Sequence, residues 1–292
     1  MSRAASELHT VRRGRPMGRA GRWRYVAHLA AWAYMAALVV PLYYLVISSV
    51  KSNIEIFNNP FTLAGPLQWS NYTVAFSQAQ LGPAILSSAY VTVSAELATL
   101  CAALPAAYAI ARSRGRAGRA LEALFSVGFL IPGFAALVPS VMLAITLNMY
   151  RTREFLILLL GAAAIPLSVL LLAQAMRAIP RELEESATID GASGARVFRS
   201  IYLPLTVPTV AVLAILNFLT FWNEYFFSLV VAGTRVETRT AQVALPTLST
   251  TNNAQYGVLA AGVIITLVPV YAVYAVLARR MEGALLAGAL KG

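Results

Sequence analysis

Six apolar segments, each long enough to cross a lipid bilayer, constrain this chain more than any other feature of its sequence. A transmembrane helix needs about 20 consecutive apolar residues. Only a short polar turn at 148–154 separates the third segment from the fourth. The sequence therefore predicts an all-α, polytopic membrane protein with six transmembrane helices. The six segments are approximately Val26–Val50, Ile85–Ile110, Leu121–Leu147, Phe155–Met176, Val207–Ala232 and Val258–Ala278.

The composition indicates that lipid, rather than water, surrounds most of the chain. Of the 292 residues, 59% are hydrophobic and 12% are charged, whereas soluble domains carry about 25% charged residues. The net charge of +11 does not indicate nucleic-acid binding, because the basic residues lie in short runs between apolar stretches and not on one folded face. The single cysteine, Cys101, excludes an intramolecular disulfide. The two histidines, His9 and His28, are too few and too poorly placed to predict a metal site.

The distribution of basic residues predicts the orientation in the membrane. Six spans place both termini on one side, and 18 Lys and Arg residues lie on that side against five on the other. Basic residues favour the cytoplasmic side, so both termini are expected in the cytoplasm. The predicted organisation is a basic cytoplasmic N-terminal tail (1–25), a six-helix transmembrane domain (26–278) and a cytoplasmic C-terminal tail (279–292). The five basic residues on the outer side are Lys51, Arg151, Arg153, Arg235 and Arg239.

One cytoplasmic loop, 177–208, carries dense helix signals. Pro180 suits a first helical position, acidic residues follow where the helix dipole favours them, and Gly191 is suited to ending the helix. Ser193 can cap a second short helix, which is expected to stop near Pro204. The loop is therefore predicted to form a helix–turn–helix on the cytoplasmic surface. The acidic residues are Glu182, Glu184 and Glu185.

Part of this loop resembles the EAA loop of the permease subunits of bacterial ABC importers. In that motif Glu-Ala-Ala is followed by a glycine and then by Ile-x-Leu-Pro. The sequence departs from the motif at Ser186, where alanine is usual, and serine is small enough to leave docking intact. The residues that carry the resemblance are Glu185-Ser186-Ala187, Gly191, Ile201, Leu203 and Pro204.

Three further regions are similar to the carbohydrate branch of these permeases, and within it most similar to the maltose-type second permease. The resemblance implies a type I ABC importer permease fold, a sugar or glycoside as the cargo, and a place in the bacterial plasma membrane. The three regions are Lys51-Ser52 with Asn59-Pro60-Phe61 and Asn71-Tyr72, then Trp222-Asn223-Glu224, and the tail Glu282-Gly283 with Ala287-Gly288-Ala289-Leu290-Lys291-Gly292.

The same resemblance implies how such a chain works. In the family the loop helix inserts into a cleft on a separate ATPase subunit, so that ATP-driven closure of the ATPases turns the membrane helices. The chain is then a non-catalytic subunit without a cofactor, and the partner subunits bind ATP and Mg. The implied partners are a second permease subunit, two ATPase subunits and an extracytoplasmic sugar-binding protein. The residues expected to couple to the ATPase are Glu185, Ser186, Ala187, Asp190, Gly191, Ala192, Phe198, Leu203 and Pro204.

Two acidic residues, Glu96 and Glu224, lie within predicted spans, where a carboxylate costs about 3 kcal/mol on insertion scales. Each belongs to a stripe of polar residues at helical spacing. Such a stripe either forms hydrogen bonds between helices or lines the sugar pathway, where an aromatic ring would stack on the sugar. The residues considered for the pathway are Glu96, Asn217, Thr220, Trp222, Asn223, Glu224 and Tyr225.

The chain has no phosphate-binding loop of its own, because that motif requires Lys directly after Gly and neither Lys51 nor Lys291 follows a glycine. Two alternatives to a permease remain. A secondary transporter or channel that acts without an ATPase would be expected to show inverted repeats, and it leaves the EAA-like loop unexplained. A membrane enzyme or assembly scaffold is disfavoured by the lack of a catalytic cluster. The sequence leaves a disaccharide, a longer oligosaccharide, an amino sugar and glycerol phosphate open as cargo.

Overall fold

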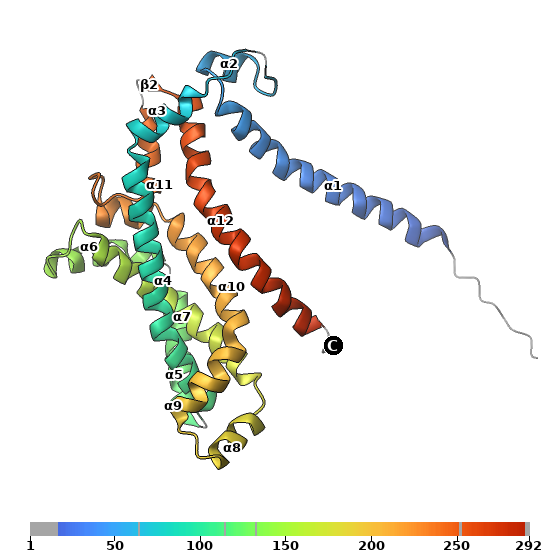
Figure 1. Ribbon diagram of the computed structural model, residues 1–292, viewed down its shortest axis with the longest axis vertical. Coiled ribbons are helices and arrows are strands. Elements are labelled where there is room, and N and C mark those ends of the chain that lie inside the picture. Colours follow the sequence, from blue (N-terminus) through green and yellow to red (C-terminus); the bar gives the residue numbers. More distant parts are fainter. Residues whose placement is uncertain (1–16, 64, 114, 132, 251–252, 290–292) are drawn as a thin grey trace, which may run out of the picture.

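The computed structural model describes residues 17–289, apart from 64, 114, 132 and 251–252, and most of them are helical. Long helices run side by side in one bundle, while α1 (Met17–Ser48) leaves the bundle at an angle (Figure 1). The other elements are α2 (Asn53–Asn58), α3 (Ser70–Gln78), α4 (Leu81–Arg112), α5 (Arg116–Leu130), η1 (Gly133–Ala136), α6 (Leu137–Thr146), α7 (Arg153–Arg177), α8 (Glu182–Ile189), α9 (Gly194–Val197), η2 (Phe198–Tyr202), α10 (Leu203–Trp222), η3 (Ser228–Ala232), α11 (Ala241–Ala244), η4 (Leu245–Leu248), β1 (Ser249–Thr250), β2 (Asn253–Ala254) and α12 (Tyr256–Ala289).

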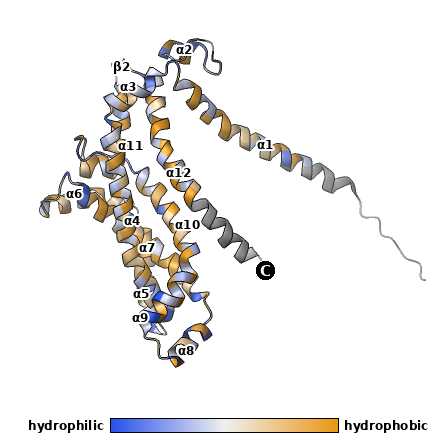
Figure 2. Cartoon of the chain, in the orientation of Figure 1, coloured by the Kyte–Doolittle hydropathy of each residue, from blue (hydrophilic) through white to orange (hydrophobic). Residues whose placement is uncertain are grey.

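Five of the described helices are long and apolar enough to span a membrane, and counting one bent helix pair as a single span gives six. Their apolar character is visible along the bundle in Figure 2. The prediction of an all-α, polytopic membrane protein is therefore confirmed. The five helical spans are Tyr25–Ser48, Leu81–Arg112, Arg153–Arg177, Gly194–Trp222 and Tyr256–Val276.

The third predicted span, Leu121–Leu147, differs from the expected continuous helix. Here α5 and the segment formed by η1 and α6 meet at an angle of 87°. Ile131, which follows α5, has an extended backbone (φ −66°, ψ 96°), and the next residue in the sequence is Pro132. A proline disfavours the helical conformation of the residue before it, so α5 ends there and the chain changes direction.

The packing of α4 against α7 forms the centre of the bundle. Small residues keep these helices close: Ala95 and Ala103 of α4 are fully buried, and a Cβ at Gly161 of α7 would lie 3.3 Å from the Ala95 carbonyl oxygen. The hydroxyl of Thr99 donates to the carbonyl of Gly161 across the interface (3.1 Å). Small residues and interhelical hydrogen bonds are the usual means by which membrane helices associate.

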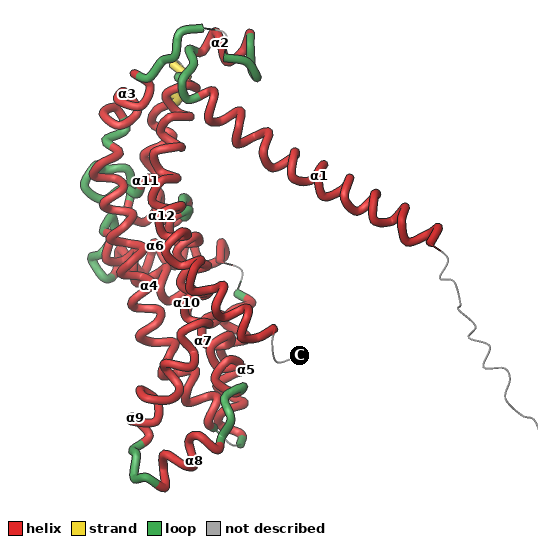
Figure 3. The backbone as a smooth tube through the Cα atoms, turned by 45° about the vertical axis from the view of Figure 1, so that its right-hand side comes forward, coloured by secondary structure: helices red, strands yellow, loops and turns green. Residues whose placement is uncertain are grey.

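In contrast to the bundle, α1 is almost unpacked. Its described side chains are exposed from Tyr25 to Tyr43, and burial begins only at Ile47 in its last turn. Figure 3, turned by 45°, shows the same separation between α1 and the rest of the chain. Many of these exposed side chains are apolar, Leu29 and Trp32 among them, so α1 requires lipid or another protein as its partner.

Two buried basic side chains cap the C-terminal ends of α2 and α3, which lie at one end of the bundle (Figure 1). The Nζ of Lys51 donates to the carbonyls of Asn59 (2.7 Å) and Pro60 (3.3 Å), just after α2. The Nη2 of Arg239 donates to the carbonyl of Ala79 (2.9 Å), just after α3. Cations stabilise the negative ends of helix dipoles. Two of the basic residues predicted on the outer side therefore have a structural task.

The fifth span begins earlier and ends earlier than predicted. Elements α9, η2 and α10 form one helix over Gly194–Trp222, so the prediction that the second loop helix stops near Pro204 is wrong. Pro204 lies in the first turn of α10, directly after the π-helical η2. The wider turns of η2 leave room for the proline ring and do not require the backbone N–H that proline lacks. Because the helix ends at Trp222, Glu224 lies in the short non-helical segment that follows it and not within a helical span.

Both predicted tails fall partly outside the described residues. Of the N-terminal tail (1–25), residues 1–16 lie outside them, and α1 begins at Met17. Of the C-terminal tail (279–292), residues 290–292 lie outside them, and α12 continues to Ala289. The first and last helices, α1 and α12, therefore extend beyond the predicted bounds of the membrane domain (26–278).

Gly257→Ala is expected to destabilise the junction between the start of α12 and the segment after α1. A Cβ at Gly257 would lie 2.3 Å from the carbonyl oxygen of Lys51 and 2.8 Å from the Nδ2 of Asn71, and overpacking of this kind costs about 1–3 kcal/mol. The thermal midpoint of the detergent-purified protein should fall. Gly133→Ala is the control, because a Cβ there meets nothing within 4 Å, and equal midpoints for the two variants would contradict the packing argument.

Candidate coupling loop and translocation face

Helix α8 projects from the end of the bundle opposite α2 and α3 (Figure 1). Glu182, Glu184 and Glu185 occupy its first turn, where the positive end of the helix dipole favours carboxylates. Its N-terminal cap is Arg181, whose carbonyl accepts the amides of Glu184 and Glu185 (both 3.0 Å). Pro180 therefore precedes the cap, and the prediction that it occupies the first helical position is wrong.

Gly191 forms the turn that follows α8. Its φ of +80° lies in the region that glycine adopts without steric cost. The amide of Ala192 donates to the carbonyl of Ala187 (2.9 Å), a bond that closes the C-terminal end of a helix. The prediction that Gly191 ends this helix is confirmed.

The residues predicted to couple to an ATPase separate into an exposed set and an inward-facing set. The ring of Phe198 packs on that of Tyr108 in α4, with 5.1 Å between centroids. The exposed set is available to a partner, and the inward-facing set holds the loop on the bundle. The exposed residues are Glu185, Ser186, Asp190, Gly191 and Pro204, and the half-buried residues are Ala187, Ala192, Phe198 and Leu203.

Ile189, which is not among the residues predicted to couple to an ATPase, is 86% exposed at the last position of α8. A groove of about 320 Å³ lies between α8 and α9, and its lining includes Arg196 and Asp190, the residue that follows Ile189. An exposed apolar side chain next to a groove with both signs of charge suits contact with another protein. The signal available in the sequence is an isoleucine placed between the EAA-like residues and the glycine.

A polar cluster between α8 and the bundle joins three elements that are far apart in the sequence. Glu184 of α8 forms an ion pair with Arg112 at the end of α4. The hydroxyl of the buried Tyr202 in η2 donates to Glu184 Oε2 (3.0 Å) and accepts from Arg112 Nη1 (3.1 Å). The sequence gives no signal for this cluster, because Arg112 and Tyr202 are separated by 90 positions.

Three of the residues considered for the sugar pathway lie inside the bundle. Both carboxylate oxygens of Glu96 are buried without a hydrogen-bond partner in the described structure, and the amide of Asn217 lies beside them. Asn217 is itself buried, and its Nδ2 donates to Ser168 Oγ (3.5 Å). Trp222 is 2% exposed and donates from Nε1 to the carbonyl of Thr266 (3.3 Å). The amide of Asn217 and the indole of Trp222 therefore connect helices through hydrogen bonds, and the carboxylate of Glu96 is enclosed beside Asn217.

Thr220 and Asn223 are exposed and differ in this respect from the buried set. The Nε2 of Gln242, in α11, donates to Asn223 Oδ1 (3.2 Å). The structure therefore adds an amide that is not among the residues considered for the pathway. Amides and hydroxyls on one surface can exchange hydrogen bonds with a polyol. We define Thr220, Asn223 and Gln242 as the candidate translocation face, which is called the translocation face below.

The last two residues considered for the pathway shape the turn after α10. Glu224 accepts the amides of Phe227 (3.1 Å) and Ser228 (3.0 Å) through its carboxylate oxygens, as a capping side chain does at the start of a helix. The ring of Tyr225 packs edge-on against that of Phe226, with 5.3 Å between centroids. Their contacts give both residues a structural task beside the translocation face.

Gly191→Ala is expected to loosen α8. A side chain in the left-handed region costs about 1–2 kcal/mol, so hydrogen exchange of the α8 amides should rise about tenfold. Mass spectrometry of the peptide that covers Glu182–Ile189 measures this change. Gly194→Ala is the matched control, because Gly194 lies in a helix and a Cβ there meets nothing within 4 Å. Equal exchange in the two variants would show that the φ of Gly191 does not stabilise the loop.

Residues 100–283 match the family described as binding-protein-dependent transport system inner membrane component. The diacetylchitobiose uptake system permease protein NgcG of Streptomyces coelicolor is 31% identical over 271 residues, which are 92% of this chain and 90% of that protein. The probable starch degradation products transport system permease protein AmyC of Thermoanaerobacterium thermosulfurigenes is 30% identical over 253 residues, 87% of this chain and 92% of that protein. The family match, over residues 100–283, includes α8 and the translocation face.

A crystal structure of a bacterial ABC transporter involved in the import of the acidic polysaccharide alginate contains a chain of the same fold. The two superpose with a TM-score of 0.80 over 91% of this chain and 99% of the other, at 20% sequence identity. At this identity the likeness concerns the fold alone. The fold predicted from the sequence is confirmed.

Proposed function

The chain belongs to the family of binding-protein-dependent transport system inner membrane components, and we propose that it is the saccharide-carrying permease subunit of an ATP-driven importer. It is a non-catalytic membrane subunit. The observation that carries the proposal is α8, a helix without a buried residue that projects from one end of the bundle. A secondary transporter acting alone would have no use for such an element.

The proposed role of α8 is to dock into an ATPase subunit, which binds ATP and Mg. Glu185, Ser186 and Asp190 are exposed on it, and Ile189 extends almost fully into solvent. Burial of a large aliphatic side chain stabilises a contact by about 1.5–3 kcal/mol. Two ATPase subunits, one for each permease, would then drive the importer.

Saccharides are the proposed cargo. The two relatives are named for diacetylchitobiose and for starch degradation products, and the structural relative belongs to an alginate importer. The translocation face offers a hydroxyl at Thr220 and side-chain amides at Asn223 and Gln242, which suit the hydroxyls of a sugar. A longer or amino-substituted oligosaccharide fits these names better than glycerol phosphate does.

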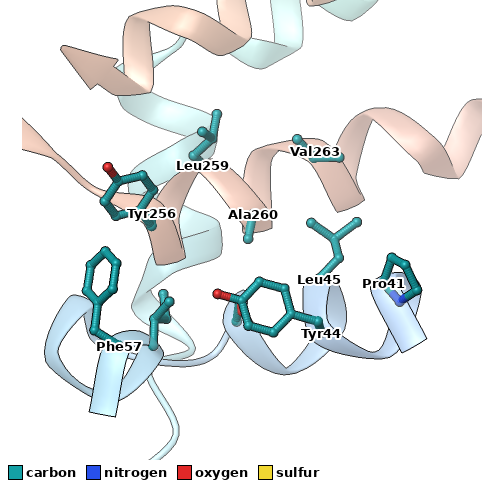
Figure 4. Close-up of a pocket in the computed structure, with 10 residues that line it drawn as sticks. Pro41, Tyr44, Leu45, Phe57, Tyr256, Leu259, Ala260 and Val263 are labelled. Carbon is teal, nitrogen blue, oxygen red and sulfur yellow. The ribbon is translucent and has the colours of Figure 1, made fainter. Parts of the chain in front are cut away.

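A second permease subunit is the proposed partner of α1. An apolar pocket of about 470 Å³ lies between the end of α1 and the start of α12. Its lining includes Tyr44, Leu45, Leu259 and Val263 (Figure 4). Pro41, on its edge, is exposed together with the preceding turns of α1. One neighbouring membrane helix could fill this pocket and cover α1, so both features support a heterodimer of permeases.

The proposed orientation places α8 and both termini in the cytoplasm of a bacterium, with α2 and α3 outside. The count of 18 basic residues against five supports it, because basic residues favour the cytoplasmic side. The arginine-rich connection from α4 to α5 and helix α8 lie at the same end of the bundle (Figure 1). An extracytoplasmic sugar-binding protein would then dock at the end that carries α2 and α3.

Ile189→Asp is expected to release the ATPase. The substitution removes the aliphatic contact and places a carboxylate where desolvation is costly, so about tenfold less ATPase should co-purify with the tagged chain from cells that express the whole complex. Ile54→Asp is the matched control, because Ile54 is 73% exposed in α2 at the opposite end. Full retention of the ATPase by Ile189→Asp, or equal loss by Ile54→Asp, would refute docking through α8.

Asn223→Ala and Gln242→Ala are expected to slow sugar uptake. Each substitution removes a side-chain amide whose hydrogen bond to the sugar would be worth about 0.5–1.5 kcal/mol. ATP-dependent uptake of labelled diacetylchitobiose or maltooligosaccharides into proteoliposomes should therefore fall about 2–10-fold. The ATPase content of the complex should not change. Thr247→Ala is the control, because the exposed Thr247 hydroxyl donates to the nearby carbonyl of Ala244. Normal uptake by both amide variants would remove the sugar-contact role of this face.

A further inference from the structure

We propose that Arg112, Glu184 and Tyr202 form a strut through which movement of α8 reaches α4. The proposal rests on the function proposed above, because it needs an ATPase that moves α8. The three residues lie behind the exposed surface of α8 and act as positioning residues. They hold the loop helix in a fixed relation to the membrane helices.

Each member of the strut comes from a different element. Arg112 ends α4, Glu184 lies in the first turn of α8, and Tyr202 ends η2. The same oxygen of Glu184, Oε2, contacts the Arg112 guanidinium and accepts the Tyr202 hydroxyl. Arg112 also donates to that hydroxyl, and its guanidinium carbon lies 5.7 Å from the centre of the Tyr202 ring. Each of the three side chains therefore contacts both of the others, so none can shift relative to the other two without breaking its contacts to them.

The strut is the principal polar attachment of α8 to the bundle. No residue of α8 is buried, and Ala187 provides its half-buried packing against the core. The ion-pair side chains are only 21% and 20% exposed, and Tyr202 is fully buried. Charge-assisted hydrogen bonds are short and directional, and shielding from water reduces the screening that weakens surface pairs. Such an attachment transmits a displacement, whereas apolar surfaces can slide.

From the strut the contacts lead into the bundle. Tyr202 packs edge-on against Tyr108, one helical turn before Arg112 on α4, with 5.0 Å between ring centroids. Helix α4 runs from one end of the bundle to the other and packs on α7. The adjoining π-helical η2 has wider turns than an α-helix, a feature frequent at functional sites. A displacement of α8 is therefore delivered both to α4 and to the start of α10.

A second ion pair at the same end of the bundle provides a matched control. Arg177, at the end of α7, donates to both carboxylate oxygens of Glu122 on α5 (2.8 and 2.7 Å). Its geometry is bidentate, which is the strong form of this interaction. Neither residue forms a described hydrogen bond or ion pair with α8. Loss of this pair should leave transmission from α8 intact.

The test measures an ATP-driven distance change in the complete complex of two permeases and two ATPases in nanodiscs. One spin label attaches to Cys101, the exposed native cysteine of α4, and the other to Val268→Cys on α12, at a position 62% exposed. The partner subunits are supplied as variants from which every cysteine has been removed. Addition of Mg-ATP with vanadate should shift the distance between the two labels in the otherwise unmodified complex.

Arg112→Gln and Glu184→Gln should each lose most of this shift while the ATPase still co-purifies and hydrolyses ATP. Tyr202→Phe keeps the ring and removes only the hydroxyl, and it should lose part of the shift. Glu122→Gln should keep the full shift.

Three results would overturn the strut: an unchanged shift in both Arg112→Gln and Glu184→Gln, an equal loss in Glu122→Gln, or loss of the ATPase from the strut variants. The last would assign these residues to docking and not to transmission. A complex without strut substitutions that contains no ATPase, or that shows no ATP-driven shift, would instead refute the proposed function. The two failures are therefore distinguishable.

Discussion

Backbone amides and carbonyls in the hydrocarbon core have no water to bond, so each membrane-crossing segment of this chain pairs them within a helix. Lipid is as apolar as leucine, so hydrophobicity does not hold these helices together, and close packing of small residues does. The contact of Gly161 with the backbone of Ala95 is the clearest case. Hydrogen bonds such as that from Thr99 to Gly161 add to this packing within the spans, and the two described ion pairs, those of Arg112 and Arg177, lie at the end of the bundle that carries α8. These polar contacts fix the relative orientation of the helices that they join.

The sequence predicts the spans and the helical loop around α8 because the signals for them are local. Span length, charge asymmetry and Gly191 are each read from a few neighbouring residues. The continuation of a helix past Pro204 depends on the π-helical turns before it, which leave no mark in the sequence. Helical periodicity places polar residues on one stripe but does not say what faces them. Glu96 is consequently buried inside the bundle, while Asn223 lies exposed with Gln242, a residue from a distant segment.

Basic residues do two tasks in this protein. Their count predicts the orientation in the membrane, and their side chains also complete local structure. Lys51 and Arg239 satisfy carbonyls at the ends of α2 and α3, and Arg112 binds the loop helix through Glu184. A lysine or glutamine at position 112 could preserve topology but would lose the planar, multiply bonding guanidinium. Charge distribution and helix attachment are thus separable properties of the same residues.

The elements least covered by the chain itself are α1 and α8, and they lie in different solvents. Around α1, lipid offers no hydrophobic reward for association, so a partner must supply shape, as a helix in the pocket beside Tyr44 and Leu259 would. Around α8, water restores the hydrophobic effect, so a single exposed Ile189 can stabilise docking. An apolar contact binds the partner but does not fix its orientation, because the hydrophobic effect is non-directional. In the proposed mechanism the hydrogen bonds among Arg112, Glu184 and Tyr202 supply that orientation, since they join α8, which binds the ATPase, to the membrane helices, which move.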